Sequence, residues 1–453
     1  MSKKNITLFN INIDKHDIIK IIMVDTKITA VIMAGGKGTR LGNLVHEIPK
    51  PMVKINDVPI IERQIIDLKN SGIKDLIIVV GYLGDVISSY FKDGKEFGVN
   101  ITYIKEDEPL GSCGSLYYLT DLVSENFILL FGDLIESVDF NNMLLFHKNK
   151  NALITLFAHP NSHPYDSDLV VKNDDDIVLK FDSKHNVRDY YYHNLVNAGI
   201  YIINKEALSY FEKPTKLDME KDFVSTLIKT EKVFAYVSSE YVKDAGTFDR
   251  LEAVGNDIKN NIVSNKNLAK KQKAIFLDRD GTINVHKGHL NNVDNFELLP
   301  GVSEAIKMIN DSDYLAIVIT NQPVISRGEL TFEGLDNVHK KMETLLGKDK
   351  AYLDAIYFCP HYPESGFEGE VKALKIDCDC RKPKIGMLLK AQKRFNIDFE
   401  SSWFVGDSDF DILCGQNAKT KTVLIDVPNK EYKSNPDYKV KSLLEAIKLI
   451  LRK

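Results

Sequence analysis

The sequence lacks long apolar runs, is poor in cysteine and carries no block of one charge sign, and each absence excludes a class of protein. No segment of its 453 residues approaches the ~20 apolar residues that a membrane-spanning helix needs. Five cysteines in so long a chain do not form a disulfide framework. With 59 basic and 64 acidic residues, nothing favours nucleic acid or an anionic membrane surface. We therefore expect a cytoplasmic protein that binds neither nucleic acid nor a membrane.

We expect no secretion signal near the N-terminus. Residues 18–23 form a short, mostly apolar run, but Asp14, Asp17 and Lys20 interrupt any signal-peptide core. We interpret 1–27 as an N-terminal extension.

The length and the pattern of apolar residues predict two domains. A chain of 453 residues exceeds what one hydrophobic core usually organises. Apolar runs rich in β-branched residues alternate with amphipathic stretches, which is typical of βα units on a largely parallel sheet. This alternation stops at 255–271, a segment rich in Asn and Lys that we interpret as a linker. We predict two α/β domains, 28–254 and 272–453.

Six segments give the clearest strand signals, and one proline gives a helix start. Pro59 stands at the first turn of a segment whose apolar residues recur on one face, which predicts a helix. The predicted strands are 30–33, 76–80 and 127–131 in the first domain, and 273–277, 315–319 and 402–405 in the second.

Two carboxylates directly follow the predicted strand 273–277. Asp278 and Asp280 stand two residues apart, so in an extended chain both project to the same side and can face one phosphate group. We expect Asp278 to attack phosphorus as a nucleophile. Asp280 would protonate the departing oxygen and later deprotonate the hydrolytic water. Gly281 would let the backbone turn away tightly.

The ends of the later strands supply the remaining parts of a phosphoryl-transfer site. Thr320 and Asn321 could hold the phosphoryl oxygens, and Lys382 supplies fixed positive charge. Asp407 follows the predicted strand 402–405, and we expect it to bind Mg²⁺ together with Asp278 and Asp280. Open α/β sheets place their sites at the carboxyl ends of strands, where each of these parts falls.

A cluster of soft ligands lies between these parts of the site. Cys359, His361, Cys378 and Cys380 supply three thiolates and an imidazole, which suits tetrahedral Zn²⁺. Since all four positions are protein ligands, we expect a structural zinc that fixes the loop before Lys382.

These motifs resemble a known superfamily. The order DxD, Thr, Lys and GDxxxD resembles the haloacid dehalogenase superfamily. More narrowly, Thr320-Asn321-Gln322, Arg327 and Cys380-Arg381-Lys382-Pro383 resemble heptose 1,7-bisphosphate phosphatases and their histidinol-phosphatase relatives. The resemblance implies a haloacid dehalogenase-like sheet. It also implies that Arg381 recognises substrate and that Lys382 stabilises the phosphoryl group, with Asn321, Gln322 and Arg327 contributing to substrate binding.

A glycine-rich turn follows the predicted strand 30–33. Its backbone N–H groups could line a triphosphate, through Gly35, Gly36, Gly38 and Thr39, with Arg40 next to them. It is not a P-loop, because Lys37 is followed by Gly38 instead of Ser or Thr. Further polar and glycine positions accompany it along the first domain: Lys50, Gly111, Gly114, Asp133 and Asp244.

The motif set GGxGTRL, PKPM, PLGxxG, GD, NAG and DxGT resembles the sugar-phosphate nucleotidyltransferases over residues 30–250. This family's Rossmann-type domain joins a sugar 1-phosphate to the α-phosphorus of an NTP, and pyrophosphate leaves. Arg40, Lys50 and Mg²⁺ would offset the negative charge. The resemblance implies Asp133 and Asp244 as Mg²⁺ ligands. It places Gly111 and Gly114 at the nucleotide, and Glu106, Lys184 and Asn197 at the sugar.

Together the two resemblances imply a bifunctional enzyme. The phosphatase would convert D-glycero-α-D-manno-heptose 1,7-bisphosphate to the 1-phosphate, and the transferase would use GTP to form GDP-heptose. Three alternatives stay open. The transferase could act on mannose 1-phosphate, or on a hexose 1-phosphate with dTTP, beside another sugar phosphatase. The phosphatase could act on histidinol phosphate. The first domain could only sense nucleotide. The oligomeric state, including a homo-oligomer, is also open.

Overall fold

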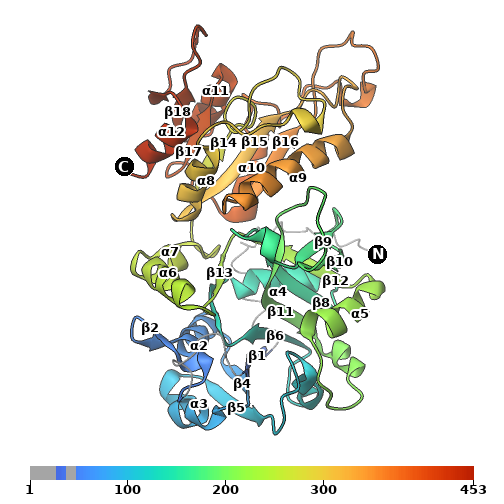
Figure 1. Ribbon diagram of the computed structural model, residues 1–453, viewed down its shortest axis with the longest axis vertical. Coiled ribbons are helices and arrows are strands. Elements are labelled where there is room, and N and C mark those ends of the chain that lie inside the picture. Colours follow the sequence, from blue (N-terminus) through green and yellow to red (C-terminus); the bar gives the residue numbers. More distant parts are fainter. Residues whose placement is uncertain (1–26, 37–46) are drawn as a thin grey trace, which may run out of the picture.

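The computed structural model describes residues 27–36 and 47–453. Residues 1–26 of the predicted extension lie outside the described residues, as do Gly38, Thr39 and Arg40. Figure 1 shows two α/β domains, the N-terminal one in blue to green and the C-terminal one in yellow to red. None of the helices in the described part of the chain is both long and apolar enough to cross a membrane.

The N-terminal domain is built on a nine-stranded sheet. Seven strands follow the order β10-β9-β11-β6-β1-β4-β5, β8 pairs with β11, and β12 pairs with β8. The strands are β1 (Thr29–Ala34), β4 (Asp75–Val80), β5 (Asn100–Lys105), β6 (Asn126–Phe131), β8 (Ile154–His159), β9 (Leu169–Lys172), β10 (Val178–Asp182), β11 (Val196–Asn204) and β12 (Val233–Val237). A short hairpin of β2 (Lys54–Ile55) and β3 (Val58–Pro59) lies outside this sheet.

This sheet is mixed, so the expectation of a largely parallel sheet is wrong for several strand pairs, although β8 and β12 also pair in parallel. β1 pairs in parallel with both β4 and β6, and β4 with β5. β11 is antiparallel to β6 and β8, and β9 to β10. The reason lies in the connections, because β9 and β10 are joined by a short turn and no crossover helix lies between them.

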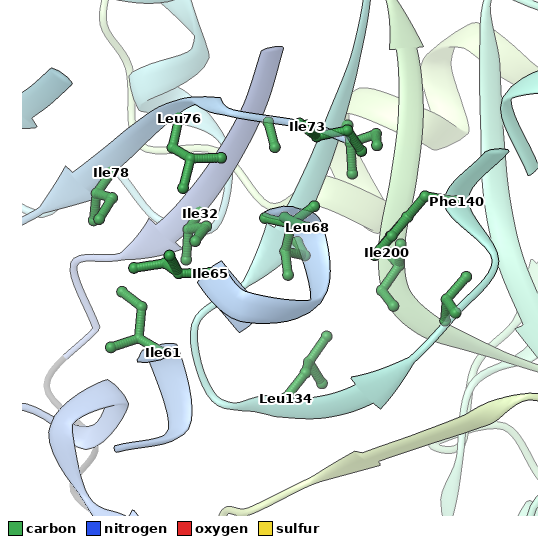
Figure 2. Close-up of a cluster of buried hydrophobic side chains, with 14 of the residues drawn as sticks. Ile32, Ile61, Ile65, Leu68, Ile73, Leu76, Ile78, Leu134, Phe140 and Ile200 are labelled. Atoms are coloured by element: carbon green, nitrogen blue, oxygen red, sulfur yellow. The ribbon is translucent and has the colours of Figure 1, made fainter. Parts of the chain in front are cut away.

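Apolar residues on alternate positions of the strands bury both faces of the sheet. On β1, Ala30 and Ile32 belong to one buried cluster, whereas Val31 belongs to the cluster on the other face. The first face packs against α2 (Ile60–Asn70), α3 (Gly84–Phe91) and α4 (Phe140–Asn149), and Figure 2 shows Ile61, Ile65 and Leu68 of α2 against it. The helix predicted after Pro59 is confirmed as α2.

The other face is covered by shorter elements. These are η4 (Gly114–Leu119), η6 (Lys205–Tyr210), η7 (Met219–Val224), α5 (Ser225–Leu227) and η8 (Ile228–Thr230). Three further single turns lie on loops: η2 (Lys50–Met52), η3 (Lys95–Phe97) and η5 (Pro164–Asp166).

A two-stranded ribbon brings a late segment back to the centre of the domain. β7 (Leu134–Ser137) pairs antiparallel with β13 (Tyr241–Asp244), which sets Asp244 opposite Leu134. Helices α6 (Phe248–Lys259) and α7 (Ile262–Asn265) follow, so part of the predicted linker 255–271 is helical.

The C-terminal domain has a six-stranded parallel sheet in the order β16-β15-β14-β17-β18-β19. Its strands are β14 (Lys273–Leu277), β15 (Tyr314–Asn321), β16 (Ala355–Cys359), β17 (Trp403–Gly406), β18 (Lys421–Ile425) and β19 (Tyr438–Val440). Helices α8 (Val302–Asn310), α9 (Phe332–Lys348) and α12 (Leu443–Ile450) cover one face, and α10 (Gly386–Phe395) and α11 (Asp409–Asn417) the other. Single turns η9 (Val293–Asn295) and η10 (Lys372–Leu374) lie on loops. The predicted strands are confirmed in both domains, within one or two residues.

Two candidate active sites

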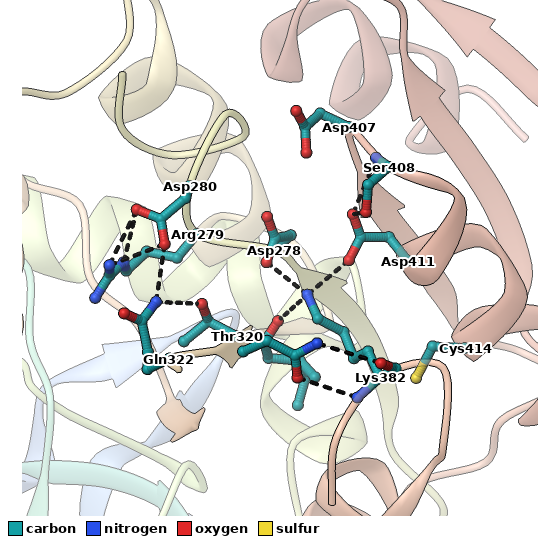
Figure 3. A network of polar contacts seen from close by, with 12 residues as sticks. Asp278, Arg279, Asp280, Thr320, Gln322, Lys382, Asp407, Ser408, Asp411 and Cys414 are labelled. Atoms are coloured by element: carbon teal, nitrogen blue, oxygen red, sulfur yellow. Dashed lines mark hydrogen bonds and ion pairs between the residues drawn. The ribbon is translucent and has the colours of Figure 1, made fainter. Parts of the chain in front are cut away.

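A buried lysine lies at the centre of the C-terminal candidate site (Figure 3). The Lys382 amine donates to a carboxylate oxygen of Asp278 at 2.5 Å and to one of Asp411 at 2.6 Å. Its third donor reaches the carbonyl of Ile319 at 2.8 Å. Asp278 directly follows β14, and Asp411 lies in the first turn of α11, so the parallel sheet gathers residues from distant parts of the chain.

Charge and burial act against each other in this cluster. Burial, together with the nearby carboxylates of Asp411 and Asp280, raises the pKa of Asp278, while Lys382 lowers it. Burial would lower the pKa of Lys382, but Asp278 and Asp411 outweigh it and raise that pKa. The lysine therefore stays charged, and the cluster holds fixed positive charge beside the expected nucleophile.

Asp278, Asp407 and Asp411 offer carboxylate oxygens that all lie within 4.8 Å of one another. Burial and repulsion by Asp411 raise the pKa of Asp407, and Lys430 offsets part of this by donating to its carboxylate at 3.3 Å. A side chain on Gly281 would come within 2.5 Å of Asp407, so only glycine leaves this space free. Crowded oxygen ligands with raised pKa values fit a hard divalent cation such as Mg²⁺.

Asp280 points away from Lys382 and is held by other donors. Its carboxylate accepts hydrogen bonds from Arg279 at 2.9 and 3.0 Å, from Asn284 at 3.0 Å and from Gln322 at 2.8 Å. Burial would raise the pKa of Asp280, but Arg279 and these hydrogen bonds lower it. Gln322 also donates to the Thr320 hydroxyl at 2.8 Å, so the same amide links Asp280 to Thr320.

A cavity of about 250 Å³ opens above these residues and is lined by Asp278, Asp280, Thr320, Arg381, Lys382 and Asp407. Asn321 also lines it, although its side chain pairs with the backbone of Lys382 at 3.0 and 3.2 Å. Arg327 is not among the lining residues, but it donates to His289, which is one of them, at 3.1 Å. Most of the predicted residues are thus brought together.

Sequence reasoning missed part of the lining and one central carboxylate. His286, His289, Phe410 and Lys430 also line the cavity. Asp411 was visible as the last residue of the GDxxxD motif, and its partner Ser408 donates to it at 2.6 Å, which caps α11. The loop histidines and Lys430 carry no such sequence signal.

The four soft ligands form one compact cluster. Cys359 and Cys378 have their sulfur atoms 3.5 Å apart, and the Cys380 sulfur lies 3.2 Å from each. His361 places Nδ1 3.3 Å from Cys380 and 3.7 Å from Cys359. These spacings are close to the ~3.8 Å edge of a tetrahedron with ~2.3 Å metal–sulfur bonds. The cluster could therefore hold a metal ion.

In the N-terminal domain, the ends of β1, β4 and β5 bring two glycines and a glutamate together. A side chain on Gly35 would come within 2.4 Å of the Glu106 carboxylate, and one on Gly81 within 2.9 Å of the Gly35 carbonyl. Among the described residues, no atom lies within 4 Å of where a side chain on Gly36 would begin. Burial raises the pKa of Glu106. Glu106 therefore lies at the glycine-rich turn, and three strands separate its strand β5 from β11, which carries Asn197.

Lys50, Asp133 and Asp244 lie close together in the structure. Lys50 is buried and pairs closely with Asp133, while the Asp244 carboxylate accepts from Arg250 at 2.5 and 2.7 Å. Burial would raise the pKa of Asp244, but Arg250 and Lys50 lower it. The Ala245 amide donates to the Asp133 carbonyl at 3.0 Å, which joins the two segments. Two neighbouring carboxylates supply the oxygen ligands that suit Mg²⁺.

The predicted sugar-side residues lie on β11 and a loop. Asn197 donates to Tyr201 at 2.5 Å and to Glu220 at 2.7 Å. Burial raises the pKa of Glu220 to about 7, and this acid was not singled out in the sequence. Lys184 is partly exposed and lies 3.4 Å from Asp166.

Gly111 and Gly114 make close backbone contacts. A side chain on Gly111 would come within 2.3 Å of the Leu217 carbonyl, and one on Gly114 within 1.9 Å of the Thr215 carbonyl. In the structure these glycines thus let their loop pack on 215–217.

Comparison with known proteins decides the family. A family model described as nucleotidyl transferase matches residues 29–261, which is more than half of the chain. A model described as HAD-hydrolase-like matches residues 379–446. The chain belongs to the nucleotidyl transferase family and, in its C-terminal part, to the heptose-bisphosphate phosphatases. It is therefore an enzyme with a transferase domain and a phosphatase domain.

The phosphatase domain has curated relatives along nearly its whole length. It is 40% identical over 183 residues to the D-glycero-β-D-manno-heptose-1,7-bisphosphate 7-phosphatase of Pasteurella multocida, covering 40% of this chain and 97% of that protein. The protein of the same name in Escherichia coli K12 is 40% identical over 159 residues, covering 35% of this chain and 81% of its own length.

Solved structures resemble the transferase domain more weakly. The crystal structure of HddC from Yersinia pseudotuberculosis is 23% identical, with a TM-score of 0.45, and covers 51% of this chain and 99% of that chain. Its complex with GMP-PN is 22% identical, with a TM-score of 0.44, at the same coverage.

Proposed function

We propose that this enzyme removes the 7-phosphate of heptose 1,7-bisphosphate and then transfers GMP from GTP to the resulting heptose 1-phosphate. The observation that carries this proposal is the Lys382, Asp278 and Asp411 cluster, found in a domain 40% identical to a heptose-bisphosphate phosphatase and fused to a nucleotidyl transferase. The product of the first reaction retains the 1-phosphate that the second reaction needs.

In the phosphatase step, Asp280 first takes up a proton, against its lowered pKa. An Asp278 oxygen then attacks phosphorus, the bond from phosphorus to the sugar oxygen breaks, and Asp280 gives that oxygen its proton. Asp280 then takes a proton from water, which attacks the aspartyl-phosphate and releases phosphate. Lys382 neutralises charge on the nucleophile, and Thr320 faces the same cavity. Asp278 and Asp407 would hold Mg²⁺, which would supply further positive charge to the phosphoryl oxygens. The carboxylate of Asp280, the third predicted ligand, instead accepts hydrogen bonds from neighbouring side chains.

In the transfer step, the sugar phosphate oxygen attacks the α-phosphorus of GTP and pyrophosphate leaves. We propose that Lys50 and Arg40 offset the charge that develops, and that Asp133 and Asp244 hold Mg²⁺. Gly35 and Gly36 would receive the triphosphate, and Asn197 with Lys184 would contact the sugar. The close packing of Asp133, Asp244 and Lys50 supports this assignment.

A substrate screen tests the choice of base and sugar. We expect pyrophosphate release to be fastest with GTP, compared with ATP, CTP, UTP and dTTP, when heptose 1-phosphate is the acceptor. The α and β anomers should be tested side by side, because we expect α whereas the names of the relatives specify β. Preference for dTTP, or for mannose 1-phosphate, would support the alternative transferases, and hydrolysis of histidinol phosphate the alternative phosphatase.

We further propose that the cysteine cluster holds a structural Zn²⁺ and that the enzyme works in the cytoplasm, where three neighbouring thiols stay reduced. The zinc would fix the segment that carries Arg381, whose guanidinium donates to the His361 carbonyl at 3.2 Å. Any homo-oligomer remains a prediction.

The zinc assignment predicts a selective effect of Cys378→Ser. This variant should lose its zinc, unfold its phosphatase domain at a lower temperature and hydrolyse the bisphosphate poorly, because a structural metal contributes folding free energy. Elemental analysis measures the zinc directly. Cys113→Ser, which changes a thiol of the transferase domain, is the control and should keep one zinc per chain. If Cys378→Ser kept one zinc per chain, the cysteine cluster would not be the zinc site.

A further inference from the structure

Helix α9 of the phosphatase domain contacts both domains. One face contributes Val338, Met342 and Leu346 to the phosphatase core. The other meets the transferase domain, where the Tyr192 amide donates to the Thr344 hydroxyl at 3.0 Å. A side chain on Gly347 would come within 2.5 Å of Pro164, so the two domains touch closely here. Figure 1 shows α9 on the side of its domain that faces the transferase domain.

A histidine of the transferase domain holds this helix at two points. His193 lies 2.5 Å from the Glu343 carboxylate through Nδ1 and 2.9 Å from the Asp336 carboxylate through Nε2. Both ring nitrogens face acceptors, which requires the doubly protonated ring. Burial would lower the pKa of His193, but Glu343 and Asp336 raise it to about 10. At neutral pH, His193 is therefore a cation bridged to two acids of α9.

The same helix carries a second histidine, one turn away from both Asp336 and Glu343, that is buried in the phosphatase domain. His339 is buried, and its Nε2 lies 3.4 Å from a guanidinium nitrogen of Arg279. Burial and the charge of Arg279 lower the pKa of His339 to about 3, so its ring is neutral and Nε2 can accept a hydrogen bond. Arg279 is itself fully buried, next to the expected nucleophile in sequence.

Arg279 in turn fixes the direction of the Asp280 carboxylate. One guanidinium nitrogen donates to both carboxylate oxygens, and Asn284 and Gln322 donate from other sides. A planar guanidinium fixes a carboxylate only if its own plane is fixed, and His339 contacts it from outside this loop. The contacts thus run from His193 through α9 to Asp280 without a break.

We propose that Arg279 and His339 are positioning residues for Asp280, and that the hold of His193 on α9 makes this positioning depend on the transferase domain. The proposal rests on the proposed function, in which Asp280 is the acid and base of phosphate hydrolysis. Neither residue touches the substrate. Their effect is on the geometry of proton transfer, where a displacement of about 1 Å costs up to about 10²-fold in rate.

The experiment compares two phosphate esters in the full-length enzyme. A sugar phosphate has a poor leaving group that needs a proton, whereas p-nitrophenolate leaves without one. Single-turnover release of the leaving group isolates this first step. His339→Leu removes the acceptor, and we expect it to slow release from the sugar bisphosphate about 10-fold more than release from p-nitrophenyl phosphate. His339→Gln keeps an acceptor and should restore most of the loss.

Two further variants separate the possible failures. Asp280→Asn should show the largest selective loss; if it shows none, the acid role in the proposed function is wrong. If Asp280→Asn is selective but His339→Leu slows both esters equally, the positioning role is wrong. His193 is exposed, so His193→Ala should fold. It therefore tests the link between the domains even if His339→Leu fails to fold. We expect it to slow sugar release about threefold, the scale of one partly exposed ion pair, and unchanged rates would overturn the link between the domains.

Discussion

Replacement of Asp278 by Asn is expected to abolish phosphate release from the bisphosphate, by roughly 10⁴-fold or more, as when a covalent nucleophile is lost. The amide cannot attack phosphorus. It also removes the negative charge that Lys382 contacts at 2.5 Å. Phosphate release measured with saturating Mg²⁺ gives the result. Nucleotidyl transfer should continue at the rate of the unchanged enzyme, because Asp278 lies in the other domain.

Asp377→Asn is the matched control for this prediction. It makes the same substitution in the same domain, at an exposed residue that pairs only with Lys384 in the described part of the chain. Its phosphate release should match that of the unchanged enzyme. If Asp278→Asn released phosphate at a comparable rate, another residue would have to be the nucleophile.

Replacement of Asp133 by Ala is expected to lower pyrophosphate formation by about 10²–10³-fold, as when one charge partner of a transition state is lost. Asp133 is close to Lys50, and its segment is joined to that of Asp244, so the change removes a proposed metal ligand and frees the lysine. Arg40→Ala should cause a loss of the same order. Both are measured as pyrophosphate release at saturating GTP and Mg²⁺.

Phosphatase turnover should stay unchanged in these two variants. Asp174→Ala, in an exposed turn of the same domain, controls for the loss of a carboxylate elsewhere. Equal loss of both activities in Asp133→Ala would instead point to unfolding or to strong coupling between the domains.

The strands and their order along the chain could be predicted because buried strands leave continuous apolar runs. The ranges 76–80 and 273–277 coincide closely with β4 and β14. The antiparallel pairing of β9, β10 and β11 in the transferase sheet could not be predicted from the sequence. Strands such as β9 alternate less regularly, and which strands become neighbours depends on turns that a period of apolar residues does not describe.

The candidate sites could be predicted where a residue directly follows a buried strand. Asp278 and Asp407 have this position, Thr320 directly follows the predicted strand 315–319, and all three line the cavity. Lys430 and His289 lie on loops whose course depends on the packing of other segments, so no local pattern identifies them. The contact of His193 with α9 joins residues 150 positions apart and could only be found in the structure.

Asp411 shows how one residue can serve two purposes that its motif does not separate. Its carboxylate caps α11 through Ser408 and also pairs with Lys382. From the sequence, an acid in the first turn of a helix has a sufficient explanation as a cap. Only the distance to Lys382 shows that it also belongs to the phosphatase site.

The central claim is that one chain makes a nucleotide sugar from the product of its own phosphatase. The purified full-length enzyme should be incubated with heptose 1,7-bisphosphate, GTP and Mg²⁺, and the phosphorus-containing products followed by NMR. We predict one phosphate, one pyrophosphate and one GDP-heptose for each bisphosphate consumed, and heptose 1-phosphate as the end product when GTP is left out. Loss of the 1-phosphate, or heptose 1-phosphate that accumulates unchanged in the presence of each of the five nucleoside triphosphates, would contradict the account.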